Sequence, residues 1–185
     1  QGENAWAVRH AAQLVRDGAI GRPLSLRVVS PTAGWGAVSP PNYAYLQDKS
    51  NGATLSTIAG GHTLAAIEAV VGAFTEVTAR ASILRDSMTL LGTEETVKRT
   101  CADHLLTFGK HASGCISSME VVGGVVDVPF QFELRGTEGA LSITGGHPGG
   151  YQAGPLEVIT NPPSPPQPEA VASGIGPNSV NVAEL

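Results

Sequence analysis

His62 is the residue whose setting in this sequence points most directly to chemistry. It follows Gly60 and Gly61, and two glycines would let another backbone or a ligand come close. An imidazole titrates near neutral pH, so it can serve as a general acid or base, or bind a hydroxyl group in a cleft. The bland alternative is a histidine whose hydrogen bonds are satisfied where a loop meets a helix, and the sequence leaves both interpretations open.

Three aromatic residues could share a cleft with this histidine. Trp35, Tyr43 and Tyr45 lie in residues 31–50, a segment rich in proline and glycine and without a periodic pattern. Loops of this length inside a domain are usually functional or disordered, and the aromatic side chains favour an ordered loop. Aromatic faces stack well on sugar rings or on nicotinamide, but the same residues could equally serve only to fix the loop.

Other familiar arrangements of chemical groups are missing from the sequence. It contains no HExxH, GxSxG or Walker motif, and the remaining histidines do not have the spacing of a metal site, so we predict no bound metal. We interpret those histidines as packed, surface or turn residues: His10, His104, His111 and His147. The nearest glycine pattern, residues 174–176, has no strand before it and predicts no dinucleotide cradle.

The composition is that of one globular domain, or of one domain and a fragment. The chain has 185 residues, 42% of them hydrophobic, and a formal net charge of -5; this length can bury a real core. Its 11 lysines and arginines are scattered, so we expect no nucleic-acid partner. No apolar run reaches about 18 residues, and we expect no membrane partner. Cys101 and Cys115 suit buried thiols in a reducing cytosol, which predicts a cytoplasmic protein.

A helix must carry His62, because residues 51–74 hold the one long helical pattern in the middle of the chain. One face of that pattern is an apolar stripe suited to packing on a sheet, formed by Leu64, Ile67, Val71 and Phe74. His62 lies roughly 160° around the helix from Leu64. Its neighbours one turn away are small or apolar: Ile58, Ala65, Ala66 and Ala69. We therefore expect two covered faces, with His62 on the second.

The remaining segments predict an α+β domain. Residues 4–17 have helical spacing, with Asn4 as the expected cap and Gly18 as the terminator. Residues 24–28 alternate as a strand does, and further strands fit at 76–83, 103–110, 113–122, 129–135, 140–144 and 155–160. Short turns between several of them predict antiparallel neighbours. We expect an open, mainly antiparallel sheet with helices packed on one face.

The order of these features resembles a known family. A helix ending in DGAIGRPLSLRV, an aromatic loop, NGATLSTIAGGHTLAAIEAVVGAF and the later FELRGTEGALSI follow one another along the chain. Over residues 1–160 this order is similar to the carboxy-terminal domain of the glucose-fructose oxidoreductase and inositol dehydrogenase (Gfo/Idh/MocA) family. Within that family, the GGHTL segment most resembles the branch that includes the galactose-regulon repressor.

The resemblance implies a parent protein of two domains. Family members join an amino-terminal Rossmann domain that binds NAD(P) to a sheet domain that shapes the substrate site and mediates oligomerisation. In the enzymes, a lysine of a Glu-Lys-Pro segment works with an aspartate and a histidine, and His62 matches that histidine. Ile58 and Ala65 stand where acids are usual, and no Glu-Lys-Pro occurs. These departures put ordinary acid/base catalysis in question.

The resemblance also divides the chain into three parts. Residues 1–20 would be a helix at the junction with a missing nucleotide-binding domain, and 21–160 a substrate-binding and oligomerisation α+β domain. Residues 161–185 are proline-rich, which predicts a loop or tail. We expect this tail to be truncated, with the start of another helix at 180–185.

Our leading hypothesis is the substrate-binding and assembly part of an NAD(P)-dependent oxidoreductase that acts on a sugar, polyol or similar hydroxyl compound. His62 would be catalytic, and the substrate contacts would come from Trp35, Tyr43, Tyr45, His62 and Thr63. The parent would bind NAD or NADP, whereas this chain alone would bind no cofactor and be inactive. The alternatives are a non-catalytic ligand-sensing or regulatory module and a domain that serves only oligomerisation. We expect a homo-oligomer that forms through the sheet.

Overall fold

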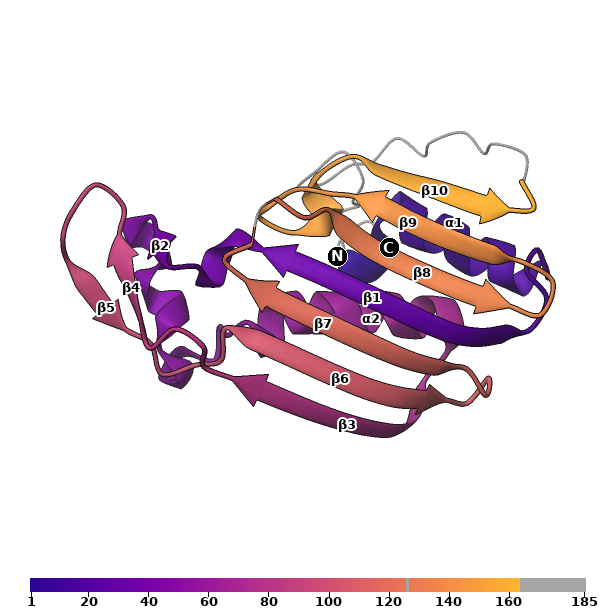
Figure 1. Cartoon of the computed structure of the whole chain (residues 1–185), viewed down its shortest axis with the longest axis horizontal. Coiled ribbons are helices and arrows are strands. Elements are labelled where there is room, and N and C mark those ends of the chain that lie inside the picture. Colours follow the sequence, from indigo (N-terminus) through magenta and orange to yellow (C-terminus); the bar gives the residue numbers. More distant parts are fainter. Residues whose placement is uncertain (126, 164–185) are drawn as a thin grey trace.

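A seven-stranded sheet forms the centre of the computed structural model, which describes residues 1–125 and 127–163 (Figure 1). The strands lie in the order β10-β9-β8-β1-β7-β6-β3. Their bounds are Pro23–Thr32 for β1, Phe74–Ser82 for β3, His104–His111 for β6, Ile116–Gly123 for β7, Phe130–Gly136 for β8, Ala140–Gly145 for β9 and Leu156–Asn161 for β10. Every neighbouring pair is antiparallel except β1 with β7. The predicted open, mainly antiparallel sheet is confirmed.

Strand β1 corrects the expected order of the sheet. Consecutive strands do pair as antiparallel neighbours in β6 with β7, β8 with β9, and β9 with β10. Strands β7 and β8, however, are separated by β1, which is parallel to β7 and antiparallel to β8. A strand from the start of the chain thus lies in the middle of a sheet whose other strands come mainly from the second half of the chain. Strand β1 ends at Thr32.

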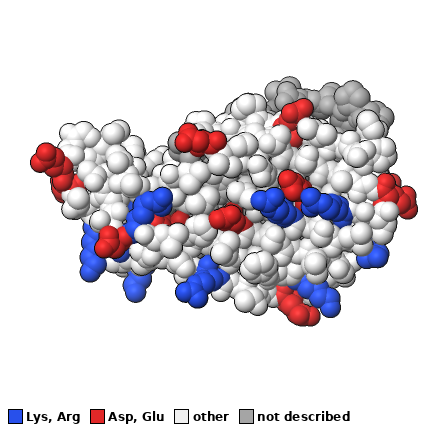
Figure 2. All heavy atoms as spheres, viewed as in Figure 1, with Lys and Arg blue, Asp and Glu red and all other residues white. Residues whose placement is uncertain are grey.

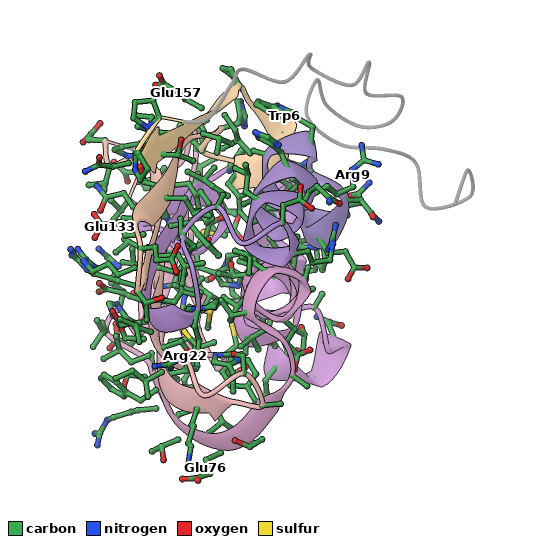
Figure 3. All side chains as sticks on the ribbon, turned by 90° about the vertical axis from the view of Figure 1, so that its right-hand side faces the viewer. Trp6, Arg9, Arg22, Glu76, Glu133 and Glu157 are labelled. Atoms are coloured by element: carbon green, nitrogen blue, oxygen red, sulfur yellow. The ribbon has the colours of Figure 1, made fainter. Side chains whose placement is uncertain are left out.

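Two helices cover one face of this sheet. Helix α1 (Trp6–Arg16) and helix α2 (Gly61–Val71) pack against each other, and both lie behind the strands in Figure 1. The side chains between helices and sheet form the core, and its fully buried members include Val8, Ala11, Ile67, Phe132 and Ile143. The opposite face has no helical cover within the described residues, and Figure 3 shows Glu133 pointing away from the helices. None of these helices has the length and apolarity that crossing a membrane requires.

The ends of helix α1 follow local backbone chemistry. Gly18 has a φ of 78°, and the N–H groups of Gly18 and Ala19 bond to the carbonyls of Val15 and Leu14. This is a Schellman ending, so Gly18 terminates the helix as predicted. The expected cap at Asn4 is wrong: Ala5 takes the N-cap position without a side-chain bond, because Asn4 belongs to a preceding 3-10 turn, Gly2–Asn4.

The central helix begins and ends inside its predicted range. A π-helical turn (Ser56–Gly60) runs directly into α2, and Gly72, with a φ of 90°, ends the helix, so Phe74 begins strand β3 instead. Its core face consists of Thr63, Ala66, Ile67, Val70 and Val71. The predicted second covered face is covered only in part within the described chain: Ala66 is buried, but Ala69 is exposed and Ile58 is 36% exposed. Besides the sheet, helix α1 and the Gly2–Asn4 turn contact this helix.

The segment after β1 is ordered, and it joins a second, smaller sheet that the sequence did not predict. Three 3-10 helices occupy Ala33–Trp35, Pro41–Gln47 and Lys49–Asn51. Between and beyond them run β2 (Val38–Ser39), β4 (Ser87–Leu90) and β5 (Thr96–Lys98), which form the small sheet. It projects from one end of the large sheet (Figure 1). The remainder of the predicted tail, residues 164–185, lies outside the described residues.

A buried ion pair ties this projecting segment to the rest of the domain. Arg99 is 2% exposed and Asp103 is 1% exposed, and Nη1 of Arg99 lies 2.8 Å from Oδ2 of Asp103. The same guanidinium donates from Nε to Oε1 of Gln47 (2.7 Å) and from Nη2 to the carbonyl of Gly36 (2.6 Å). Asp103 also accepts the backbone N–H of Leu84 (2.7 Å). The bonds from Arg99 to Gln47 and Gly36, and from Asp103 to Leu84, join segments that are far apart in the sequence.

Removing one partner of this pair should strongly destabilise the chain. We expect Arg99→Met to lower the free energy of unfolding by about 3–5 kcal/mol, because the buried carboxylate of Asp103 loses its closest cation and keeps only the Arg85 guanidinium at 3.5 Å. The measurement is urea denaturation followed by circular dichroism. The matched control is Arg27→Met, since Arg27 is largely exposed and lies 3.9 Å from Glu133; it should change stability by less than about 1 kcal/mol. Equal effects of the two substitutions would contradict the role given to Arg99.

Candidate functional site

One pocket brings together four of the five predicted site residues. Its volume is about 200 Å³, and Trp35, Tyr43, Tyr45 and His62 all line it. Its walls come from the carboxyl end of β1, the 3-10 helices that follow, the junction of the π turn with α2, and residues 149–152. These segments are far apart in the sequence, so their convergence is a result of the sheet topology.

His62 occupies the first turn of α2 and is half-buried. Burial lowers the pKa of His62 below its ordinary value. The imidazole is therefore mainly neutral at pH 7, so one ring nitrogen can accept a proton and the other can donate one. Within the described residues, no hydrogen bond satisfies the His62 ring, and this does not support the interpretation of a locally satisfied histidine.

Tyr151 fixes the backbone at His62. Its hydroxyl donates to the carbonyl of His62 over 3.0 Å, and its ring stacks on Phe130 with centroids 4.1 Å apart. The Tyr151 side chain is buried, and burial raises its pKa far above the ordinary value, so this hydroxyl keeps its proton. Gly2 lies so close to both residues that a side chain there would collide with the Tyr151 hydroxyl. Sequence reasoning missed Tyr151.

The glycines before His62 serve packing more than ligand access. A Cβ added to Gly60 would lie 3.0 Å from Cδ2 of Leu105 on strand β6, so this glycine lets the π turn approach the sheet. A Cβ at Gly61 would meet nothing within 4 Å. The π turn itself is informative, because π-helical turns occur frequently at functional sites.

Thr63 lies behind the pocket and is not part of its lining. It is fully buried, and its hydroxyl is 2.8 Å from the carbonyl of Ala59 and 3.0 Å from the hydroxyl of Ser30. These contacts join α2 to strand β1. Thr63 follows His62 in the sequence, but its side chain does not join the other four predicted residues in the pocket.

The three aromatic residues differ in what they expose. Trp35 is 3% exposed, and its indole N–H donates to the carbonyl of Leu46 over 3.1 Å, so it fixes the loop. Tyr43 and Tyr45 are 40% and 52% exposed and keep much of their ring surface accessible. Trp35 therefore fits the interpretation that the aromatic residues fix the loop, whereas Tyr43 and Tyr45 keep ring surface available for a ligand.

Two residues at the far wall of the pocket escaped the sequence analysis. Gly150 is the last residue of the glycine-rich GGHPGG segment and Gln152 lies two residues beyond it; within that segment the carbonyl of Pro148 accepts the N–H of Ala33 over 2.7 Å. His147 of that segment lines a neighbouring pocket, and its Nδ1 accepts the N–H of Gly149. The density of glycines was the available signal, since it marks a place where backbone can approach closely.

His111 and both cysteines have structural surroundings. His111 is buried: its Nδ1 donates to the carbonyl of Gly72 (2.7 Å), and its Nε2 lies 2.8 Å from the hydroxyl of Ser117. Cys101 and Cys115 are buried free thiols, and burial raises the pKa of Cys115 to about 11. No group of three or more potential metal ligands exists among the described residues.

Comparison with known proteins agrees with this fold. The family model of the Gal80p C-terminal domain matches residues 7–145. The galactose/lactose metabolism regulatory protein GAL80 of Kluyveromyces lactis is 29% identical over 158 residues, which cover 78% of this chain and 34% of that protein. Dehydrogenase aclE of Aspergillus oryzae is 30% identical over 140 residues, which cover 72% of this chain and 38% of the dehydrogenase.

Solved structures show the same likeness. A super-repressor mutant of Gal80p from Saccharomyces cerevisiae superposes with a TM-score of 0.77 at 21% identity, covering 86% of this chain and 44% of that one. Levoglucosan dehydrogenase in complex with NADH and levoglucosan superposes with a TM-score of 0.64 at 26% identity, covering 77% and 38%. The chain therefore spans less than half the length of these relatives. It belongs to the family of domains typified by the C-terminal domain of Gal80p, within the Gfo/Idh/MocA group that its sequence resembles.

Proposed function

We propose that the chain is the substrate-binding and assembly part of an NAD(P)-dependent oxidoreductase that acts on a sugar, polyol or similar small hydroxyl compound. The observation that carries the proposal is the position of His62. Its imidazole, with a lowered pKa and no hydrogen bond to a described residue, lines the same pocket as the exposed rings of Tyr43 and Tyr45. That combination suits a ligand with hydroxyl groups and apolar ring faces.

In this proposal, His62 takes the proton of the substrate hydroxyl. A neutral imidazole can accept that proton near pH 7. The hydrogen bond from Tyr151 to the carbonyl of His62 holds the first turn of α2, and with it the ring, in one position. Tyr43 and Tyr45 bind the ring faces of the substrate, and Trp35 holds the loop that carries them. Thr63 supports this arrangement from behind through its contacts with Ser30 and Ala59.

The cofactor would bind to a part of the parent protein outside this chain. The glycine-rich segments of the described residues lie in turns between strands and not in the strand-turn-helix setting that holds a dinucleotide. NAD(P), where bound, supplies hydride transfer. The relatives support this reading, because dehydrogenase aclE is 30% identical and levoglucosan dehydrogenase binds NADH together with its sugar. In this division of labour, residues 1–20 adjoin the cofactor part, and the parent is a cytoplasmic enzyme.

A second candidate function is a non-catalytic sensing module. The observation that favours it is that no acidic residue is among the described residues that line the pocket: Ile58 lies there where the family enzymes carry an acid, and Ala65 takes the other usual position. The likeness to GAL80, a regulatory protein, supports this candidate. Such a module would bind the same kind of ligand without turnover, so turnover by the full-length parent distinguishes the two candidates.

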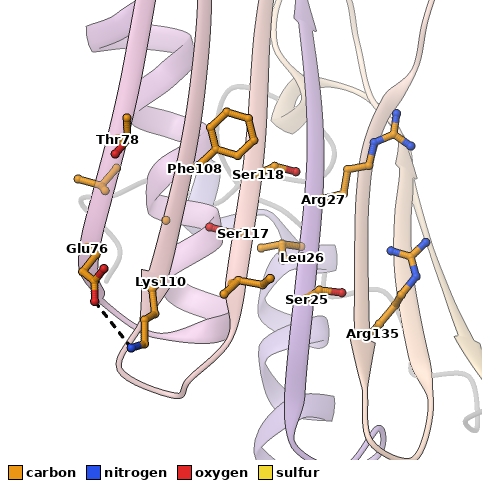
Figure 4. Close-up of a pocket in the computed structure, with 13 residues that line it drawn as sticks. Ser25, Leu26, Arg27, Glu76, Thr78, Phe108, Lys110, Ser117, Ser118 and Arg135 are labelled. Atoms are coloured by element: carbon orange, nitrogen blue, oxygen red, sulfur yellow. Dashed lines mark ion pairs between the residues drawn. The ribbon is translucent and has the colours of Figure 1, made fainter.

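The uncovered face of the large sheet is our proposed site of assembly with a second copy. It presents exposed apolar side chains at Phe108 (61%) and Ile116 (59%) beside a shallow groove of about 490 Å³ (Figure 4). The ion pair of Lys110 with Glu76 borders the groove. Charges of both signs are scattered over this face between uncharged side chains (Figure 2). A self-complementary face of this kind suits a two-fold dimer.

Replacing His62 tests its role as the base. We expect His62→Gln in the full-length parent to lower kcat/KM by roughly 10²–10⁴-fold, the usual contribution of a general base. The wild-type rate should fall as the pH drops through the lowered pKa of His62, because the base must be unprotonated. This acidic limb should disappear in His62→Gln. A parent that turns over normally after the substitution would refute the assignment.

Calorimetric titration with NAD(H) and NADP(H) tests the division of labour. The 185-residue chain should show no heat of binding, because its described residues form no cradle for the pyrophosphate. The full-length parent should bind one of the two dinucleotides at a micromolar level. Tight binding by the chain alone would show that the cofactor site lies within it.

Charge placed on the uncovered face should disrupt assembly. We expect Phe108→Asp and Ile116→Asp to convert a dimer into a monomer, because each places an unpaired charge in an apolar contact. Analytical ultracentrifugation measures the change. Leu91→Asp is the matched control, since Leu91 is 60% exposed but lies beyond β4, in the small sheet region. A wild-type monomer, or equal effects of all three substitutions, would contradict the proposed interface.

A further inference from the structure

Gln152 carries a polar atom that the described chain leaves unsatisfied. Its Oε1 is buried and has no hydrogen-bond partner, although the residue lines the same pocket as His62. Leaving a buried acceptor unpaired is costly, and native proteins usually satisfy such atoms with water or a ligand. Trp6 Nε1 and His10 Nδ1 are similarly unpaired, but both lie on α1 and neither lines this pocket.

The surrounding backbone holds Gln152 in place. Tyr151, the residue before it, is fixed by its ring stack with Phe130 and by its bond to the carbonyl of His62. Gly150 has a φ of 146°, and a Cβ there would lie 2.9 Å from Nε2 and 3.0 Å from Oε1 of Gln152. The amide group thus rests against a position that only glycine leaves free. A flexible surface glutamine would not show this combination of constraints.

The chemistry of the lining limits what can occupy the pocket. Among the described residues that line it, none has a carboxylate, ammonium or guanidinium group. A phosphate or carboxylate on the ligand would therefore be buried without a counter-charge, which is costly. Hydroxyl groups suit the site, because an amide oxygen accepts an O–H while the amide nitrogen donates to a second hydroxyl.

We propose that Gln152 contacts the ligand directly and that, together with His62, it makes the pocket selective for uncharged polyhydroxyl compounds over their phosphorylated or carboxylated analogues. One hydroxyl donates to Oε1 of Gln152, and a nearby hydroxyl faces the His62 imidazole. The rings of Tyr43 and Tyr45 cover the apolar faces of the ligand. This inference rests on the proposed function, since it assumes that the pocket binds the substrate.

Saturation-transfer NMR on the intact protein tests the inference with four probes: myo-inositol, glucose, glucose 6-phosphate and glucuronate. The wild type should bind at least one of the two neutral probes and bind the two anions at least 10-fold more weakly. Gln152→Leu should weaken binding of the neutral probe on the order of 10-fold, because one buried hydrogen bond is lost. The matched control is Gln13→Leu on the outer face of α1, which should bind as the wild type does.

A second variant separates ligand contact from folding. Gln152→Asn keeps an uncharged amide with its acceptor oxygen, so it should retain neutral-probe binding better than Gln152→Leu does. Circular dichroism verifies that each variant is folded.

The outcomes separate this inference from the function beneath it. If the wild type binds a neutral probe and a folded Gln152→Leu binds it equally well, the contact is wrong and the proposed function stands. Anions that bind as tightly as the neutral probes overturn the selectivity. A wild type that binds none of the four overturns both proposals.

Discussion

The buried ion pair of Arg99 and Asp103 is the constraint on which the site depends. A desolvated guanidinium is tolerable only when its N–H groups are all engaged, and the acceptors available to Arg99 lie on different segments: Gln47, Gly36 and Asp103. Satisfying this one cation therefore draws the loop after β1 onto the end of the large sheet. That loop carries Trp35, Tyr43 and Tyr45. Arg99 therefore positions this wall of the pocket although it does not line the pocket itself.

The wall formed by residues 149–152 is held by a ring stack and by hydrogen bonds between uncharged groups. Tyr151 couples three elements, because its ring stacks on Phe130 of β8 while its hydroxyl binds the first turn of α2 at His62. The glycine-rich turn before it binds back to the loop after β1 through Pro148 and Ala33. The pocket is thus closed by hydrogen bonds between loops, and its shape depends on both anchors at once.

The parts of this fold that follow local periodicity could be predicted, and the parts set by long-range pairing could not. Alternation located β6 to β10 to within a few residues, and Gly18 marked the end of α1 because a positive φ is a local requirement. Nothing local indicates that β1 lies between β7 and β8. That placement comes from hydrogen bonds along both edges of β1, whose partner strands lie about a hundred residues away in the sequence. Arg99 likewise looks like a surface residue until Gln47 and Gly36 are brought to it. His62 was found because its type is chemically suggestive, whereas Gln152 has meaning only through the atoms around it.

Catalysis and sensing require different things of the same pocket. Both need a surface that binds hydroxyl groups and apolar ring faces, which Tyr43, Tyr45 and Gln152 can provide. A catalyst also needs a group whose proton affinity matches that of the reacting hydroxyl at working pH, and a neutral imidazole at His62 meets that need without a neighbouring acid. An acid in place of Ile58 or Ala65 would raise the pKa of His62 and strengthen it as a base, while burial with apolar neighbours lowers that pKa and weakens it. In the function proposed for this chain, the balance between these two effects would decide whether the pocket turns its ligand over or only binds it.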